Sequence, residues 1–246
     1  MFNGTLVFIA LVFVLAGIVK GGIGLGLPTI AMGLLALSMP PVEAAAILLL
    51  PSFATNLWQA LTGPAFAGVL RRLWPMLLAV CIGTWAGLGL MTGTNARFGT
   101  ALLGTALAIY AVTGLAELRL PSPKAWEPVL SPIVGAVTGL ITAATGVFVI
   151  PAVPYLQAIG LEKEEFVQSL GLSFTVSTLA LAVNIGSEGG IGLAMAAGTL
   201  VGLGAASAGM WLGQILRGRL SAAAFRKTFF LGLLVLGIYL AARSVL

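Results

Sequence analysis

Long runs without a charged residue follow one another along this chain, separated by short polar intervals. The runs cover residues 5–37 (with Lys20 as the one charge inside), 44–70, 73–96, 98–116, 129–161, 166–187, 189–216 and 228–242. About 20 apolar residues in a helix cross the hydrocarbon core of a bilayer. The pattern predicts eight hydrophobic segments and an all-α polytopic membrane protein.

A polar, proline-containing interval divides the chain into two halves that resemble each other. Residues 16–28 align with residues 138–151, and the alignment pairs Gly17 with Gly139 and Gly24 with Gly146. Further on it pairs Glu43 with Glu165 and Thr55 with Ser177. We predict an N-terminal repeat over 1–118, a linker over 119–128 and a C-terminal repeat over 129–246, since internal duplication is common in transporters. Chance similarity between two Gly-rich apolar runs is the alternative.

The first run of each half is too long for one ordinary span. About 33 residues of helix would measure roughly 50 Å, whereas the hydrocarbon core is roughly 30 Å thick. Glycines at 21, 22, 24 and 26 precede Pro28, and Gly146 precedes Pro151. Glycine costs about 1 kcal/mol in a helix interior and proline suits the first turn of a new helix. Both runs are therefore predicted to break there and fold back as hairpins.

The distribution of lysine and arginine favours these hairpins. If both long runs were single spans, the basic residues outside them would divide almost evenly between the two sides of the membrane. If both runs return to their own side, only Arg97 and Arg243 lie outside, as the positive-inside rule expects for short loops. We therefore predict two inverted repeats in the inner membrane, each a broken-helix hairpin followed by three transmembrane helices, with both termini on the outer side. The eight segments become six full spans plus two hairpins.

The composition excludes several classes of protein. Hydrophobic residues make up 59% of the chain and charged residues 8%, and the mean hydropathy is +1.12, which a soluble domain could not cover. The net charge of +5 reflects orientation in the lipid bilayer rather than binding to nucleic acid. With no histidine, no aspartate and all seven glutamates at segment ends, we expect no metal, no cofactor, no enzymatic activity and no carboxylate proton relay.

The two hairpin tips are the predicted binding site. Each tip starts a short helix, near Pro28 and Pro151, whose free amides and positive dipole end attract a small anionic substrate. Lys20 adds a cation, because a lone ammonium inside an apolar run is costly and usually functional. The alternative is that Lys20 snorkels to an interface. The candidate binding residues are Lys20, Gly22, Gly24, Gly26, Asn56, Gln59, Thr142, Thr145, Gly146 and Ser177.

Polar and small residues also form stripes on later helices. Ser52, Thr55, Asn56 and Gln59 share one helix face, and Ser169, Ser173 and Ser177 share another. These stripes either face the substrate or make interhelical hydrogen bonds without a ligand. The pairs Gly83/Gly87, Gly198/Gly202 and Gly209/Gly213 are predicted to be helix packing seams.

At its paired Gly-Pro segments, residues 16–28 and 139–151, the sequence resembles the TauE/SafE-type sulfite exporter family over essentially the whole chain. The resemblance implies a membrane permease for small sulfur-containing anions, such as sulfite or organosulfonates, with other small organic anions as further candidates. A homodimer is compatible with this but not required. The alternatives are a passive anion channel and a membrane scaffold without transport.

Overall fold

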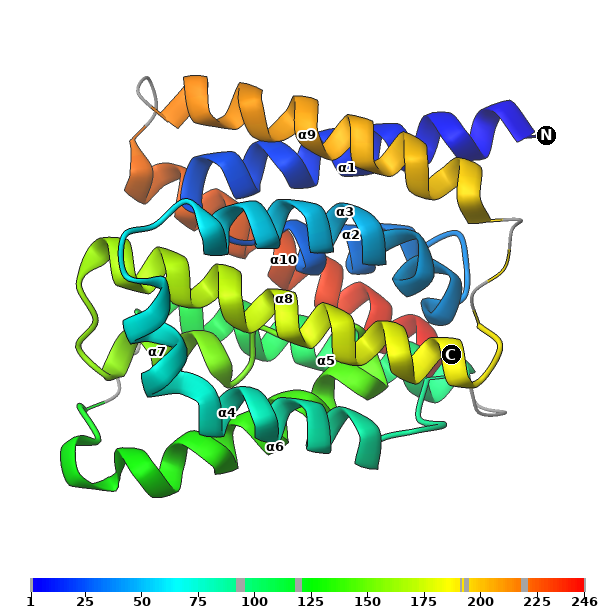
Figure 1. Cartoon of the computed structure of the whole chain (residues 1–246). Helices are drawn as coiled ribbons and strands as arrows, with labels where there is room; N and C mark the ends of the chain where they lie inside the picture. The colour runs from blue at the N-terminus through cyan, green and yellow to red at the C-terminus, as the bar shows by residue number, and fades with distance from the viewer. Residues whose placement is uncertain are drawn as a thin grey trace.

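The computed structural model describes residues 2–91, 96–117, 121–190, 192, 195–217 and 221–245, which are helical almost throughout (Figure 1). The helices in chain order are α1 (Phe2–Ile23), α2 (Leu27–Leu35), α3 (Pro41–Leu61), α4 (Phe66–Ala86), α5 (Ala96–Leu115), η1 (Lys124–Trp126), α6 (Glu127–Thr145), α7 (Ala152–Ala158), α8 (Lys163–Ser187), α9 (Ala196–Arg217) and α10 (Ala222–Val245). Eight of them are long and apolar enough to cross a membrane. The predicted all-α polytopic class is confirmed.

Both long runs break where glycine and proline predicted. α1 ends at Ile23, and α2 begins at Leu27 with a proline in its first turn, after Gly24 and Gly26 have taken positive φ angles of 80° and 103°. In the second half, Gly146 ends α6 with a φ of 69°. Each break joins a long helix to a short one that folds back, so the predicted hairpins are present.

The two arms of each hairpin are unequal, and in this the structure differs from the prediction. The first arms, α1 and α6, have 22 and 19 residues, whereas the return arms, α2 and α7, have 9 and 7. At about 1.5 Å per residue, each first arm is itself long enough to span the hydrocarbon core. The described residues therefore contain eight candidate spans rather than six, because the breaks lie close to the far ends of the first arms.

Five helices in the same order make up each half: a long helix, a short one and three long ones. The packing repeats as well, since α1 packs on α9 and its counterpart α6 packs on α4, while α3 packs on α8 and α5 on α10. In Figure 1 the α1/α9 pair and the α4/α6 pair form the two outer layers around α3 and α8. The first helix of each half thus packs mainly on a helix of the other half. The repeat boundaries and the inversion of the repeats in the bilayer stay predictions.

Glycines let the two outer pairs approach closely. A Cβ atom at Gly209 or Gly213 of α9 would collide with backbone oxygens of α1, and one at Gly83 of α4 would collide with the backbone of α6. These predicted seams are confirmed. Gly198 and Gly202 instead face side chains, from Ile9, Ile47 and Phe13, and Gly87 faces the Cβ atom of Ala143.

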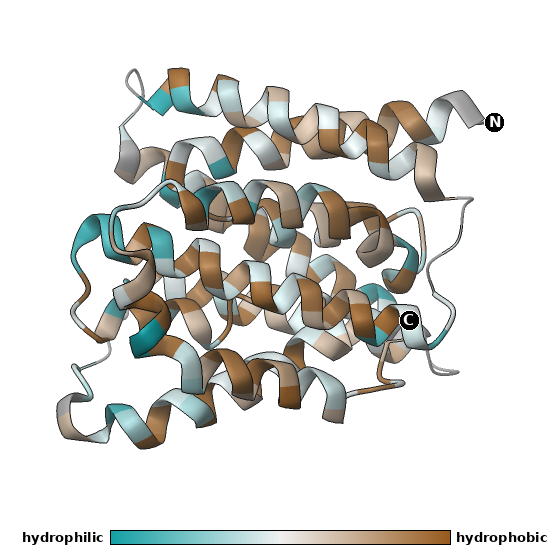
Figure 2. Ribbon diagram, viewed as in Figure 1, coloured by the Kyte–Doolittle hydropathy of each residue, from teal (hydrophilic) through white to brown (hydrophobic). Residues whose placement is uncertain are grey.

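The outer faces of the bundle are apolar. Leu11, Trp85 and Val183 are examples of large hydrophobic side chains that are at least 65% exposed. Figure 2 shows hydrophobic residues along the lengths of the helices, with the most hydrophilic ones mainly towards the helix ends. Such a surface suits hydrocarbon rather than water.

Candidate functional site

Lys20 lies buried close to the first hairpin turn, with only 3% of its surface exposed. Its ammonium group donates a hydrogen bond to the side-chain oxygen of Asn56 on α3. An ammonium has three N–H donors, and no other partner for it is found among the described residues. Lys20 therefore does not snorkel to an interface in this structure, and it lies in the protein interior without a carboxylate.

A chain of hydrogen bonds continues from Asn56 into the second half. Asn56 donates from Nδ2 to Ser52 Oγ (2.9 Å), and Ser52 Oγ lies 3.2 Å from Thr178 Oγ1 on α8. Because the Thr178 hydroxyl donates to the carbonyl of Phe174 (2.7 Å), Ser52 is the donor to Thr178. These hydrogen bonds therefore all point the same way, from the Lys20 ammonium through α3 to α8. They join the two halves of the protein at a buried position.

The glycines of the first turn have different surroundings. A Cβ atom at Gly24 would meet nothing within 4 Å, whereas one at Gly22 would meet the ring of Phe225 and one at Gly26 would meet Val19 and Phe229. The amide of Gly24 already donates to the carbonyl of Lys20 (2.7 Å). The Gly24 amide is therefore engaged within the turn in this structure, and Gly24 leaves open space beside the turn.

The second turn satisfies its own polar groups. Thr142 donates to the carbonyl of Thr138 (2.7 Å), and Thr145 donates to that of Ile141 (2.6 Å) while accepting from the amide of Val147 (3.1 Å). The amide of Gly146 donates to the carbonyl of Thr142 (2.8 Å). These predicted site residues are all engaged with their own hairpin here.

The second turn also touches the first hairpin, but not at its turn. A Cβ atom at Gly146 would lie 2.8 Å from the terminal methyl group of Met32, on the return arm α2. The ring of Phe148, in the same turn, packs on that of Phe174 on α8, with centroids 5.1 Å apart. The structure thus joins the second turn to α2 and α8, while Lys20 contacts α3.

The predicted polar stripes serve two purposes. Gln59 donates to the carbonyl of Val167 (2.8 Å), and Gln168 donates to the carbonyls of Ala60 (2.6 Å) and Gly63 (2.9 Å), so these amides fasten α3 to α8. The hydroxyl of Ser177 is buried and has no hydrogen-bond partner among the described residues. Gln59 therefore has a structural partner, and Ser177 remains available to a ligand.

Ser52 and Thr178 belong to the polar cluster although neither was among the predicted site residues. Both were visible as polar residues on apolar helices, but their sequence positions do not show which of them would face Lys20. Pairing between residues 126 positions apart depends on how α3 and α8 are rotated against each other.

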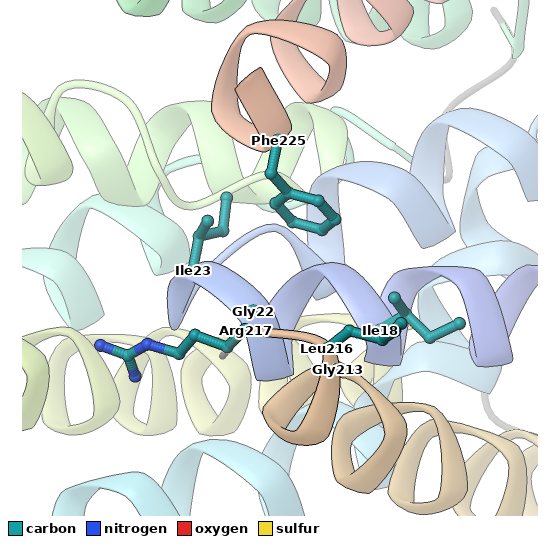
Figure 3. Close-up of a pocket in the computed structure, with 7 residues that line it drawn as sticks. All are labelled: Ile18, Gly22, Ile23, Gly213, Leu216, Arg217 and Phe225. Atoms are coloured by element: carbon teal, nitrogen blue, oxygen red, sulfur yellow. The ribbon is translucent and has the colours of Figure 1, made fainter. Parts of the chain in front are cut away.

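Two cavities accompany these helices without reaching the Lys20 ammonium. One lies at the end of α1 and is lined by Ile18, Gly22, Ile23, Gly213, Leu216, Arg217 and Phe225, with the guanidinium of Arg217 pointing away from the ring of Phe225 (Figure 3). The other is lined by Ala54, Thr55, Trp58, Ser207 and Met210. Neither includes Lys20 or Asn56, so the polar cluster is closed off from both of these cavities.

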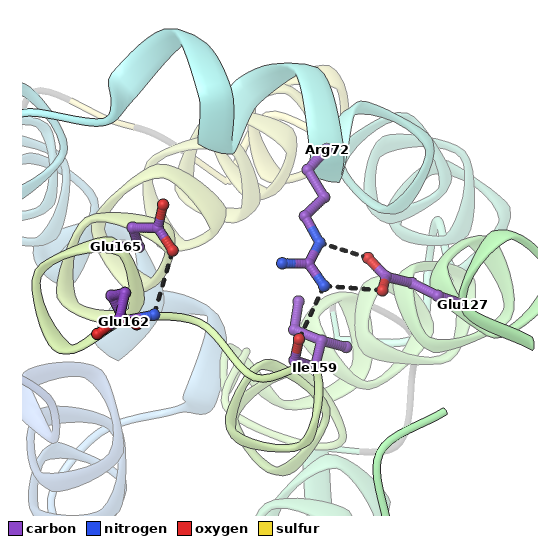
Figure 4. A network of polar contacts seen from close by, with 5 residues as sticks. All are labelled: Arg72, Glu127, Ile159, Glu162 and Glu165. Carbon is purple, nitrogen blue, oxygen red and sulfur yellow. Dashed lines mark hydrogen bonds and ion pairs between the residues drawn. The ribbon is translucent and has the colours of Figure 1, made fainter. Parts of the chain in front are cut away.

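Arg72 on α4 forms a connected group of polar contacts with two other helix ends. Its guanidinium donates to both carboxylate oxygens of Glu127 (2.6 and 2.8 Å) and to the carbonyl of Ile159 (2.7 Å), as Figure 4 shows. Nearby, Glu162 and Glu165 form a capping box at the start of α8. The Arg72 group joins α4, the start of α6 and the end of α7.

Eight long apolar helices, two helix breaks inside the bundle and a buried polar cluster define a multi-pass helical membrane protein with a polar interior. A sequence model of the family described as Sulfite exporter TauE/SafE matches residues 9–240, nearly the whole chain, and the chain belongs to that family. Comparisons with curated proteins and with solved structures give no match. The predicted family is thereby confirmed, and the protein is a transporter-like membrane protein of an exporter family rather than an enzyme.

Proposed function

We propose that this protein is a secondary transporter of the inner membrane for a small anion, with sulfite or an organosulfonate as the first candidate. The observation that carries this proposal is the Lys20 ammonium, which is buried with a single neutral partner. An isolated charge of this kind is costly unless a counter-charge or further hydrogen bonds compensate it. A substrate anion would supply both, and the family description names sulfite.

The surroundings of Lys20 suit a small oxyanion. Two of the three ammonium donors have no partner within the described part of the chain and can bind substrate oxygens. Asn56 could also donate to the same ligand if its amide left Ser52. Gly24 leaves space beside the turn. The N-terminus of α2 has no side-chain cap, and the positive end of its helix dipole lies at this turn. Thr142, Thr145 and Ser177 are assigned to neutral hydrogen bonds that form after the second hairpin moves.

Transport through this site requires movement. Lys20 and Asn56 are both buried, so at least one path must open before an anion enters. In the proposed mechanism the two repeats are inverted and rock around the hairpins, which exposes the site to one side at a time. In Figure 1 the start of α1 and the end of α10 lie at the same edge of the bundle, which supports a topology with both termini on one side of the membrane. We assign that side to the outer one from the distribution of lysine and arginine.

Few groups in this protein could couple transport of the substrate to the movement of a proton or another ion. The sequence contains no aspartate, and the glutamates lie at segment ends, so no carboxylate is available for a proton relay at the centre of the membrane. In our proposal, transport is either uncoupled or coupled through the substrate's own proton or a co-ion held by backbone carbonyls.

The direct test is thermal unfolding of the detergent-purified protein with and without anions. Sulfite, a short organosulfonate, a carboxylate and phosphate are compared at rising concentration, on the wild type, on Lys20→Met and on the control Lys227→Met. Sulfite or the sulfonate should raise the Tm of the wild type and of the control but not of Lys20→Met, because binding to the folded state stabilises it. No shift in the wild type at saturating anion would refute the proposed function.

Flux measurements separate the remaining alternatives. In proteoliposomes a transporter saturates with anion concentration, whereas a passive channel conducts in proportion to the gradient. A scaffold without transport would show no flux above protein-free vesicles, with or without Lys20.

Cysteine labelling tests the topology. Cysteines placed at Ser38 and Gly160, in a chain whose only cysteine has been removed by Cys81→Ala, should react with an impermeant reagent from opposite sides of the membrane. Reaction of both from the same side would rule out the inverted repeats while leaving the anion-binding test unaffected.

A further inference from the structure

The ends of the two return arms each carry one equivalent carbonyl that accepts a hydrogen bond from a side chain. Leu37 follows α2 and Ile159 follows α7, and each lies four residues before the next helix, which begins at Pro41 or at Lys163. The alignment that pairs Gly24 with Gly146 also pairs Leu37 with Ile159. The two carbonyls therefore occupy the same place in the two repeats.

Each of these carbonyls accepts a hydrogen bond from an arginine on another helix. Arg72 of α4 donates to Ile159 (2.7 Å), and Arg243 of α10 donates to Leu37 (3.0 Å). The arginines are not equivalent, because the counterpart of α4 in the second half is α9 rather than α10. The two acceptor carbonyls are thus equivalent, but the two arginine donors are not. Duplication of a single ancestral contact does not explain this pairing.

The two contacts differ in strength. Arg72 is also held by both oxygens of Glu127, so three hydrogen bonds fix its guanidinium, and paired charge-assisted bonds are the stronger kind. Arg243 is exposed, and no ion pair joins it to a carboxylate within the described part of the chain. The return arm of the second hairpin is therefore tied more firmly than that of the first.

We propose that Arg72 and Arg243 are positioning residues that hold the return arms of the hairpins closed, and that the Arg243 contact releases first. The freed arm, α2, belongs to the hairpin that carries Lys20, so its release would be the first step in opening the site. The link to transport rests on the proposed function, whereas the holding of the arms does not.

Amide hydrogen exchange of the purified protein tests the holding directly and needs no substrate. Arg243→Gln should speed exchange about tenfold in residues 36–40 and leave 152–162 unchanged, because one hydrogen bond at an exposed site is lost. Arg72→Gln should do the reverse, with a larger increase, because a charge-assisted group is lost. In the wild type, residues 36–40 should exchange faster than residues 158–162.

Two further variants keep the test decisive. Glu127→Gln leaves the Arg72 donor to Ile159 but loosens its anchor, so it should give a smaller increase in residues 152–162 if Arg72→Gln does not fold. Arg243→Lys retains a donor and should restore part of the protection of residues 36–40. Equal increases in both segments, or no increase in either, would overturn the proposal.

Transport kinetics separate positioning from general stability. Arg243→Gln should change the maximal rate of anion flux in proteoliposomes by several-fold while the anion concentration at half-saturation stays within about twofold. A matching change in half-saturation would contradict a positioning role. If exchange responds as expected but no anion binds to the wild type, the holding of the arms stands and only the proposed function fails.

Discussion

The backbone of Gly146 lies against the side chain of Met32, which brings the turn of the second hairpin onto the return arm of the first. The same glycine has a φ of 69°, a conformation that residues with a Cβ atom seldom adopt. Two independent restrictions, one of backbone conformation and one of space, thus act at the point where the hairpins meet.

Gly146→Ala should therefore destabilise the protein by about 1–3 kcal/mol, mainly from the left-handed backbone. Displacing the flexible but fully buried Met32 side chain should add a smaller part of the loss. Gly160→Ala is the matched control, because Gly160 has a similar φ of 71° but open space around its Cβ position. It should cost only about 1 kcal/mol. Denaturant unfolding in detergent measures both, and equal losses would mean that the contact with Met32 carries no energy.

Asn56→Leu should cost about 2–4 kcal/mol, because it leaves the Lys20 ammonium buried without its hydrogen-bond partner. Adding Lys20→Met should recover most of that loss, since the uncompensated charge is then absent. The double-mutant cycle is measured by unfolding in detergent. Additive effects of the two changes would show that Lys20 and Asn56 do not interact.

Gly213→Ala should cost about 2 kcal/mol or more, because its Cβ atom would push α9 away from the carbonyl of Ile18 on α1. Gly204→Ala on the same helix meets nothing within 4 Å and should be neutral or stabilise the protein by about 0.5–1 kcal/mol. Thermal unfolding of the two variants, measured side by side, gives the two changes in stability. A loss of stability in Gly204→Ala as large as in Gly213→Ala would show that the contact with Ile18 is not the cause, because Ala favours a helix more than Gly does.

Ser177→Ala should raise the Tm of the anion-free protein, because it removes a buried hydroxyl that has no partner. It should also reduce the Tm shift caused by sulfite, since Ser177 is assigned to the substrate path. Ser173→Ala removes another buried hydroxyl without a partner, outside the assigned site, and should raise the Tm without reducing the shift. Identical anion responses in the two variants would remove Ser177 from the site.

The helical class and the positions of the helix breaks were predictable from sequence, because hydropathy, glycine and proline act locally. The lengths of the hairpin arms were not, since the first arm continues for as long as packing on α9 or α4 supports it. A run of 33 apolar residues shows that a break is needed but not how the remainder is shared between the arms.

The candidate site was predictable only in part. Lys20 and Asn56 stood out as polar residues in apolar segments, but their pairing depends on the relative rotation of α1 and α3. The glycines were predicted as amide donors, whereas the amides of Gly24 and Gly146 close their own turns. The contact of Arg243 with Leu37 joins residues 206 positions apart and has no local signature in the sequence.

Because the first helix of each half packs on the other half, α1 and its main partner α9 are made at very different times during synthesis. Gly17 on α1 lies against Ala206 on α9, about 190 residues further along the chain. At roughly 5–20 residues per second of synthesis, α1 waits on the order of 10 to 40 seconds in the membrane before its partner exists. The largest helix contact of α1 can therefore form only after α9 has been made, and α1 stays without it during that time.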